Sequence, residues 1–142
     1  MDITIQQLTT ATVEDARDIT ALMPQITNNH YRPLDMQRLR QVLDAGSMVF
    51  VARDGDRVVG AVVLVRARQL VGDKYWVEDL VVDQAYRGQG VASRLMDLAL
   101  GLVPDDAYSV NLTSKASRST AHAWYERLGF QQYSMVFRLR RK

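Results

Sequence analysis

The sequence predicts one α/β domain over residues 1–142, with a mixed sheet, helices on both faces and the order β-α-α-β-β-β-α-β-α-β. Its 142 residues are 47% hydrophobic, which is enough to bury a core without cross-links. Apolar residues recur every two positions in some segments and every three or four in others, which indicates strands and helices. Neither a repeat nor a linker-like stretch interrupts this pattern, so we expect no second domain.

The first part of the chain predicts a strand and two helices. Apolar and polar residues alternate over residues 3–5, as in a strand. Thr12 is placed to cap a first amphipathic helix, because its hydroxyl can accept a backbone hydrogen bond. Asp35 is placed to cap a second, shorter helix that we expect to end at Gly46.

The middle of the chain predicts a hairpin and a further strand. Two valine-rich runs, 48–53 and 58–66, flank Asp54-Gly55-Asp56 and are typical of antiparallel strands joined by a tight turn. A β-branched and aromatic run over residues 75–82 follows. It ends where residues 83–88 turn into the next helix.

The last part predicts a helix, a buried strand, a helix and a final strand. Apolar residues occupy one face of a helix after Gly90, and residues 108–112 resemble a buried strand. Residues 121–128 have helical spacing, with Gly129 placed to end that helix. The final strand is predicted from four alternating apolar residues, Tyr133, Met135, Phe137 and Leu139.

Composition excludes several classes of function. The chain has no cysteine, so disulfides, thiolate metal sites and cysteine nucleophiles are excluded. Its 18 basic and 16 acidic residues give a net charge of +2, which does not indicate a nucleic-acid partner. No apolar run approaches the length of about 18 residues that a membrane helix needs, and no leader segment is recognisable. We therefore expect a soluble cytoplasmic protein with no membrane partner.

A glycine-rich turn indicates an anion site. Gly88-Gln89-Gly90 lies between a strand and a helix, where backbone N–H groups and the helix dipole favour a phosphate. A dinucleotide-binding motif would need a third glycine at Ser93, and a P-loop would need Gly-Lys-Ser/Thr. Both nucleotide motifs are therefore excluded by the residues present.

Two motifs together resemble a known family. Arg87-x-x-Gly90-x-Ala92 follows the strand 78–82, and a Trp124-Tyr125 pair on a helix precedes Leu-Gly-Phe at 128–130. In these motifs and in the order of its elements, the chain resembles the GNAT superfamily of acetyl-CoA-dependent N-acetyltransferases. The resemblance implies that the turn wraps the pyrophosphate of coenzyme A, with contacts from Arg87, Gly88, Gln89, Gly90, Val91 and Ala92.

The resemblance also implies a role for the strand before the turn. Leu80, Val81 and Val82 match the cofactor-binding segment, in which the backbone of Leu80 and Val82 would pair with the pantetheine arm. This places the acetyl carbonyl near a main-chain N–H of the strand, which would stabilise an oxyanion.

Tyr125 is the candidate general acid. The resemblance implies that its hydroxyl lies near the sulfur of the cofactor, and a phenol still carries its proton at neutral pH. The alternative is a packing role, because Tyr125 shares a helical face with Trp124 and Leu128.

Glu78 and Asp79 are the candidate bases. Glu78 lies nine residues before Arg87, which is the position of the glutamate that serves as base, often through water, in several family members. Strand alternation sends Glu78 and Asp79 to opposite faces unless a bulge intervenes. We therefore prefer Glu78, with Asp79 second. A salt bridge at the sheet surface is the alternative role for either.

Arg118 departs from the family pattern. The residue seven positions before the tyrosine is commonly asparagine in the family, whereas here it is Arg118. A guanidinium suits phosphate or carboxylate, so Arg118 would bind the cofactor or an anionic group of the acceptor, or else be solvated.

In the family, the loop between the first two helices usually lines the acceptor site, so the resemblance points to His30, Tyr31 and Arg32 as acceptor-binding residues. The alternatives are a surface His30 and a Tyr31 packed on Pro33.

The resemblance implies an enzyme that moves acetyl from acetyl-CoA to a primary amine of a small metabolite. A protein or peptide amine is the second choice of acceptor. A noncatalytic acyl-CoA-binding sensor on the same fold is a further alternative, because a fold does not determine a function. Acetyl-CoA is the expected cosubstrate and no metal is expected. The acceptor's identity and the oligomeric state, including a homodimer, are left open by the sequence.

Overall fold

The computed structural model describes residues 2–27 and 31–141. Its elements run in the order β1 (Ile3–Leu8), α1 (Val13–Ile26), α2 (Met36–Asp44), β2 (Met48–Asp54), β3 (Arg57–Gln69), β4 (Gly72–Val82), the 3-10 helix η1 (Gln84–Tyr86), α3 (Val91–Gly101), β5 (Ser109–Asn111) and α4 (Ser119–Arg127). The predicted α/β class with a mixed sheet is confirmed.

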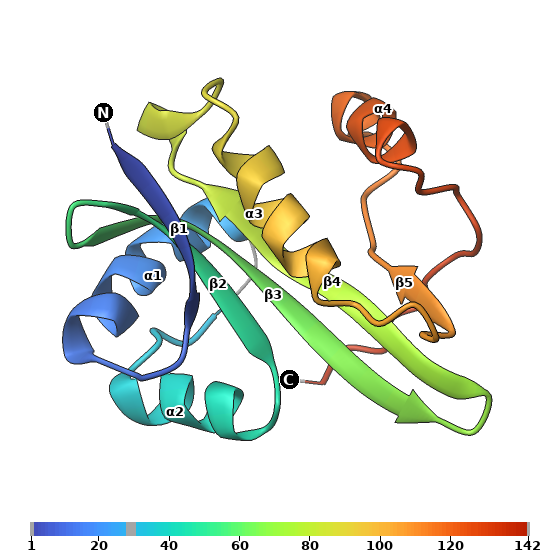
Figure 1. Ribbon diagram of the computed structural model, residues 1–142, viewed down its shortest axis with the longest axis horizontal. Helices are drawn as coiled ribbons and strands as arrows, with labels where there is room; N and C mark the ends of the chain where they lie inside the picture. Colours follow the sequence, from blue (N-terminus) through green and yellow to red (C-terminus); the bar gives the residue numbers. More distant parts are fainter. Residues whose placement is uncertain (1, 28–30, 142) are drawn as a thin grey trace.

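The sheet has five strands in the order β1-β2-β3-β4-β5 (Figure 1). The first three pairings are antiparallel and the fourth, between β4 and β5, is parallel. Strands β2 and β3 form the predicted hairpin around Gly55, whose φ is +62°, a conformation that favours glycine. Strands β3 and β4 form a second, longer antiparallel hairpin.

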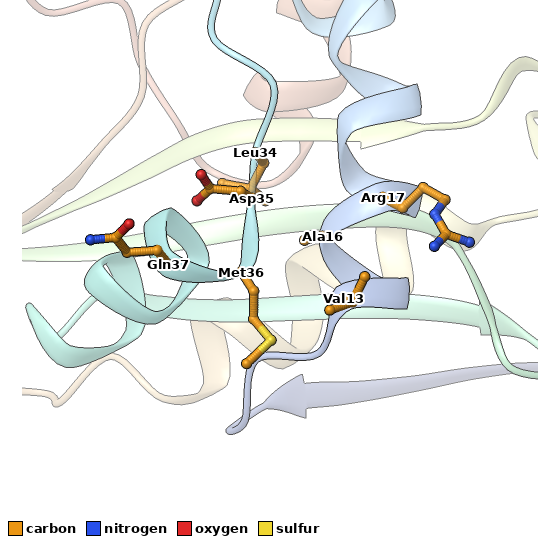
Figure 2. Close-up of a pocket in the computed structure, with 7 residues that line it drawn as sticks. All are labelled: Val13, Ala16, Arg17, Leu34, Asp35, Met36 and Gln37. Atoms are coloured by element: carbon orange, nitrogen blue, oxygen red, sulfur yellow. The ribbon is translucent and has the colours of Figure 1, made fainter.

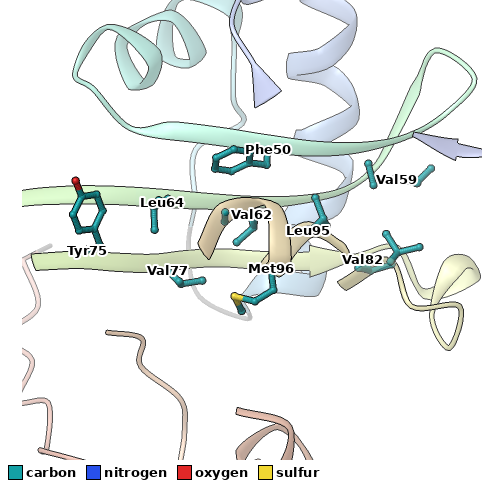
Figure 3. Packing of buried hydrophobic residues seen from close by; sticks show 12 residues of the cluster. Phe50, Val59, Val62, Leu64, Tyr75, Val77, Val82, Leu95 and Met96 are labelled. Carbon is teal, nitrogen blue, oxygen red and sulfur yellow. The ribbon is translucent and has the colours of Figure 1, made fainter. Parts of the chain in front are cut away.

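Helices cover both faces of the sheet, as predicted (Figure 1). Side chains alternate along each strand, so neighbouring residues enter different cores. Phe50 packs toward α3 and Val51 toward α1 and α2, and both are fully buried. Figure 3 shows Leu95 and Met96 of α3 projecting onto the strands, and burying each contributes about 1.5 to 3 kcal/mol.

Side-chain caps begin the two N-terminal helices. The Thr12 hydroxyl accepts a hydrogen bond of 3.1 Å from the backbone N–H of Asp15. The Asp35 carboxylate accepts one of 2.7 Å from the N–H of Arg38. Each cap satisfies a backbone donor that the helix itself leaves unpaired, which confirms both predicted starts. Among the helices of the described residues, none is long and apolar enough to cross a membrane.

The end of the chain differs from the prediction. In residues 130–141 the structure describes no strand after α4, so the strand expected through Tyr133 and Phe137 is absent. These two side chains are 95% and 89% exposed. Alternating apolar residues predict a strand face but not a partner, and the neighbouring β5 offers only three paired residues. β5 itself is shorter than predicted and half-buried rather than buried.

A buried ion pair joins α1 to β2. Nη1 and Nη2 of Arg53 donate hydrogen bonds of 2.8 and 3.0 Å to the two carboxylate oxygens of Asp15. Asp15 is only 5% exposed. The hydrogen bonds from Arg53 lower the pKa of the Asp15 carboxyl below its ordinary value.

We expect Asp15→Asn to lower the free energy of unfolding at pH 7 by about 3 kcal/mol, because it leaves the Arg53 charge without its buried partner. The lowered pKa of Asp15 means that this stabilisation is complete above the ordinary aspartate range and is lost as the pH falls through the folded value. Urea unfolding should therefore show a difference between wild type and variant that shrinks below about pH 4.

The matched control is Arg68→Ala, which breaks the exposed pair between Arg68 and Asp73. This substitution should lower the free energy of unfolding by less than about 1 kcal/mol, because water screens an exposed pair. An Asp15→Asn variant as stable as this control would contradict the prediction.

Candidate active site

A β-bulge in β4 begins directly after Glu78 and contains Asp79, so it lies at the two candidate bases. The β3–β4 register shifts between Ala61 and Val63, so two residues of β4 lie opposite one of β3. Within this bulge Asp79 adopts a φ of +53°, the left-handed region, in which a non-glycine residue is strained. Strict alternation is broken here, so Glu78 and Asp79 are not forced onto opposite faces of the sheet.

The bulge lies just beyond the point where β4 and β5 stop pairing. Their parallel ladder ends at Trp76 and Asn111. Figure 1 shows the chain continuing from β5 toward α4. Beyond Trp76, in the described residues, β4 has no strand partner on its β5 side, and Leu80 and Val82 lie in this stretch. The open side of β4 offers backbone N–H and C=O groups to an extended ligand.

Both acidic groups at the bulge have raised pKa values. Burial raises the pKa of Glu78, and the nearby charge of Asp79 raises it further. Burial also raises the pKa of Asp79. As a whole residue, Glu78 is half-buried and Asp79 is more exposed. Neither carboxylate forms an ion pair within the described residues, so the alternative role as a surface salt bridge is not observed.

The glycine turn leads directly into the N-terminus of α3. Gly90 is the N-cap residue, with φ +80° and ψ 10°, and Gly88 has the same positive φ. No side chain caps this helix, so the N–H groups of its first turn face outward without a side-chain acceptor. Val91 is buried and fixes the helix to the sheet. The turn is therefore rigidly placed and able to bind an anion.

Arg87 at the start of this turn is held by two acceptors. Its Nε donates a hydrogen bond of 2.9 Å to the carbonyl of Val82. Its Nη2 donates one of 3.0 Å to Oε1 of Gln25, at the end of α1. The same oxygen accepts a hydrogen bond of 2.9 Å from the N–H of Gln84.

Further contacts fix η1 to the β2–β3 turn. The Tyr86 hydroxyl donates a hydrogen bond to the Asp54 carboxylate, and Arg57 forms an ion pair of 3.2 Å with Asp83. The guanidinium of Arg57 also lies 5.9 Å from the centre of the Tyr86 ring. The segment that leads into the turn is thus tied to the hairpin.

Tyr125 lies on α4, half-buried and in contact with two aromatic rings. Its ring centre is 5.3 Å from that of Trp124 and 6.2 Å from that of Phe130. Tyr125 packs against the core on the α3 face of the sheet, as does Leu80 of β4. Its hydroxyl has no hydrogen-bond partner in the part of the chain that the structure describes. Tyr125 therefore packs against the core and also has a hydroxyl that is available to form a hydrogen bond.

The remaining predicted site residues are exposed or not described. Arg118 is the N-cap residue of α4 and is exposed, with no side-chain partner among the described residues. Tyr31 and Arg32 are exposed in the segment before α2. His30 lies outside the described residues.

Sequence reasoning missed two polar residues of this region. Gln25 carries no local signal, because its contacts are to residues about sixty positions away in the chain. Ser114 follows β5, and its hydroxyl oxygen is buried without a hydrogen-bond partner among the described residues. A buried unpaired hydroxyl is costly, but only a three-dimensional structure shows it.

A shallow apolar groove lies away from these residues, between the beginnings of α1 and α2 (Figure 2). Val13 lines the groove, whereas Gln25 lies twelve residues further along α1, which is about 18 Å at a rise of about 1.5 Å per residue. Over residues 2–27 and 31–141 no three acidic or histidine side chains gather as a metal site would require.

The comparisons with known proteins identify the family. The model of the Acetyltransferase (GNAT) family matches residues 13–130, which is most of the chain. The chain belongs to this family. The resemblance inferred from the two motifs is thereby confirmed. As a GNAT member, the chain has its glycine turn and its closing Leu-Gly-Phe within the matched region.

One curated relative matches about two thirds of the chain. The chain is 34% identical over 94 residues to N-alpha-acetyltransferase 30 of Schizosaccharomyces pombe, a match that covers 63% of the chain and 61% of that relative. It therefore spans less than two thirds of this curated relative.

Solved structures share the fold at low identity. Glucosamine-6-phosphate N-acetyltransferase from Arabidopsis thaliana superposes with a TM-score of 0.82 at 16% identity, covering 99% of both chains. Aminoglycoside N-acetyltransferase AAC(6')-Iy, solved in complex with CoA, superposes with a TM-score of 0.79 at 16% identity, covering 99% of this chain and 95% of its own.

Proposed function

We propose that this GNAT protein transfers the acetyl group of acetyl-CoA to a primary amine. The observation that carries the proposal is the position of the β4 bulge, with two carboxyl groups of raised pKa, between the glycine turn and the end of the β4–β5 ladder. Family membership supports the activity, and a related fold has been solved with CoA.

The cofactor would lie along the open side of β4 and end at the glycine turn. The turn residues, 87–92, suit the diphosphate because α3 begins there with unpaired N–H groups and a favourable dipole. The backbone of Leu80 would pair with the pantetheine arm, since β4 has no strand partner on that side. Val82 is more restricted, because its carbonyl already accepts a hydrogen bond from Arg87.

Acetyl-CoA supplies an activated acyl group as a thioester, and the protein supplies the proton transfers. Glu78 takes a proton from the amine, directly or through water, so that the nitrogen can form its bond to the carbonyl carbon. A backbone N–H of the bulge stabilises the oxyanion that forms. As the carbon–sulfur bond breaks, the Tyr125 hydroxyl donates its proton to the departing thiolate.

We expect Glu78→Gln to lower kcat by at least about tenfold at pH values where Glu78 is ionised, because only the carboxylate can accept a proton from the amine, and the rates of the two proteins should converge at low pH. Because burial raises the pKa of Glu78, the wild-type rate should rise with pH at higher pH than an ordinary glutamate would give. The pH dependence of kcat, measured for both proteins, checks this.

The control is Glu14→Gln at the exposed beginning of α1, which should leave the profile unchanged. A profile that Glu78→Gln does not alter would transfer the role of base to Asp79 or to bulk water.

For the acceptor we propose a primary amine of a small metabolite, contacted by residues of the segment 30–32 before α2. Arg118 is proposed to recognise an anionic group of this acceptor, because its exposed guanidinium begins the helix that carries Tyr125. A second candidate is the α-amine of a peptide, which is favoured by the 34% identity to an N-alpha-acetyltransferase.

One experiment separates these acceptors. Purified protein and acetyl-CoA are incubated with a panel of neutral and anionic small amines and of short peptides, and free CoA is measured. Turnover with small amines supports the first candidate, and turnover with peptides alone supports the second. CoA binding without turnover on any amine would instead support a noncatalytic acyl-CoA sensor.

A further inference from the structure

We propose that Gln25 is a positioning residue for the cofactor turn. Its side-chain amide oxygen holds Arg87 in the orientation that binds the diphosphate of coenzyme A. This inference rests on the proposed function, because it assumes that the turn binds that diphosphate. Gln25 lies in the last turn of α1, outside the cofactor motif and on a different layer of the fold from α3.

One oxygen of Gln25 accepts hydrogen bonds from two donors at the two ends of η1, where Gln84 is the first residue and Arg87 the C-cap residue. Oε1 accepts 2.9 Å from the N–H of Gln84 and 3.0 Å from Nη2 of Arg87. The first contact fixes the backbone that enters the turn, and the second fixes the arginine that begins it. A single substitution at Gln25 therefore releases both.

Two nitrogens of the Arg87 guanidinium are hydrogen-bonded within the protein, and the third is available to a ligand. Nε is bonded to the carbonyl of Val82 and Nη2 to Gln25, so two acceptors at different angles determine the plane of the guanidinium. Its Nη1 has no partner among the described residues. A planar guanidinium that is already fixed in this way can bind a phosphate with little further loss of side-chain entropy.

Without Gln25, Arg87 would keep only its contact with Val82. The side chain is otherwise exposed, so the guanidinium would sample other orientations and would have to be ordered when the diphosphate binds. We therefore expect a loss of affinity that depends on the diphosphate and not on the acyl group or the pantetheine arm.

The experiment uses Gln25→Met, which keeps the length and helix propensity of the side chain but removes its amide. The dissociation constant of CoA is measured by calorimetry, and KM is measured for acetyl-CoA and for S-acetylpantetheine, which lacks the diphosphate. The matched control is Gln41→Met on α2, because Gln41 is exposed and its side chain has no partner among the described residues. Arg87→Ala and the double variant complete a thermodynamic cycle.

Gln25→Met should raise the dissociation constant of CoA and the KM for acetyl-CoA by about threefold to tenfold, with kcat nearly unchanged. The KM for S-acetylpantetheine should not move, and Gln41→Met should behave as wild type. In the Arg87→Ala background most of the effect of Gln25→Met should disappear, because its partner is absent.

Two results would overturn the inference while leaving the proposed function intact. One is a Gln25→Met variant that binds CoA as wild type does although Arg87→Ala binds it more weakly. The other is an equal rise in KM for both donors, which would mean a general disturbance of the fold. If Arg87→Ala itself leaves CoA binding unchanged, the turn is not the diphosphate site, and the proposed function loses its cofactor assignment as well.

Discussion

Tyr125→Phe is expected to lower kcat by about 10² to 10⁴ while leaving the affinity for acetyl-CoA nearly unchanged. The substitution removes only the hydroxyl, so the ring contacts with Trp124 and Phe130 are kept. Without a proton donor the thiolate must leave as an anion, which raises the barrier of the step in which the carbon–sulfur bond breaks. Steady-state kinetics together with calorimetric titration of CoA measure the two quantities separately.

The control for this variant is Tyr133→Phe, since Tyr133 is 95% exposed at the end of the chain. It should retain the wild-type kcat. If kcat of Tyr125→Phe also stays within about threefold of wild type, the role of Tyr125 is to pack against the core, and the proton must come from elsewhere.

Gly90→Val is expected to abolish the rise in melting temperature that CoA gives the wild-type protein. A ligand of the native state at a hundred times its dissociation constant stabilises it by about 2.7 kcal/mol, so the shift in wild type is easily measured. At Gly90 a Cβ would meet no atom within 4 Å, and the substitution acts through the backbone, because φ is +80°. A β-branched residue resists this conformation, so the N–H groups of the turn would be displaced.

Gly101→Val in the last turn of α3 is the matched control, because its Cβ is equally unobstructed and its φ is not positive. It should keep the CoA-dependent shift. Gly90→Ala should lie between the two, which also covers the case in which Gly90→Val does not fold. A CoA shift of wild-type size in Gly90→Val would mean that the phosphate turn has been placed wrongly.

Local signals accounted for most of the fold. Thr12 and Asp35 were predicted as helix caps because each cap depends on a donor only three residues away. The Gly55 hairpin was predicted for the same reason, since its turn chemistry is contained in a few residues. The motif around Gly90 likewise lies within one strand-turn-helix unit, and the family match confirms the resemblance that rested on it.

The failures involve contacts between distant parts of the chain. The strand expected through Phe137 needs an edge to pair with, and alternation of side chains says nothing of that edge. The bulge at Asp79 depends on the register with β3, so the sequence analysis could name a bulge only as an exception to strand alternation. Gln25 reaches Arg87 across 62 positions, and no spacing rule covers such a contact.

The central sheet divides the interior into two separate cores, one shared with α3 and one with α1 and α2. The glycine turn lies on the first side, where Val91 of α3 is buried, whereas α1, which carries Gln25, packs on the second side. A substitution in the core beneath α1 would therefore change the position of Gln25 without altering any residue of the glycine turn. The contact between Gln25 and Arg87 crosses this division. Repacking on the α1 face of the sheet would therefore be felt at Arg87 on the other face.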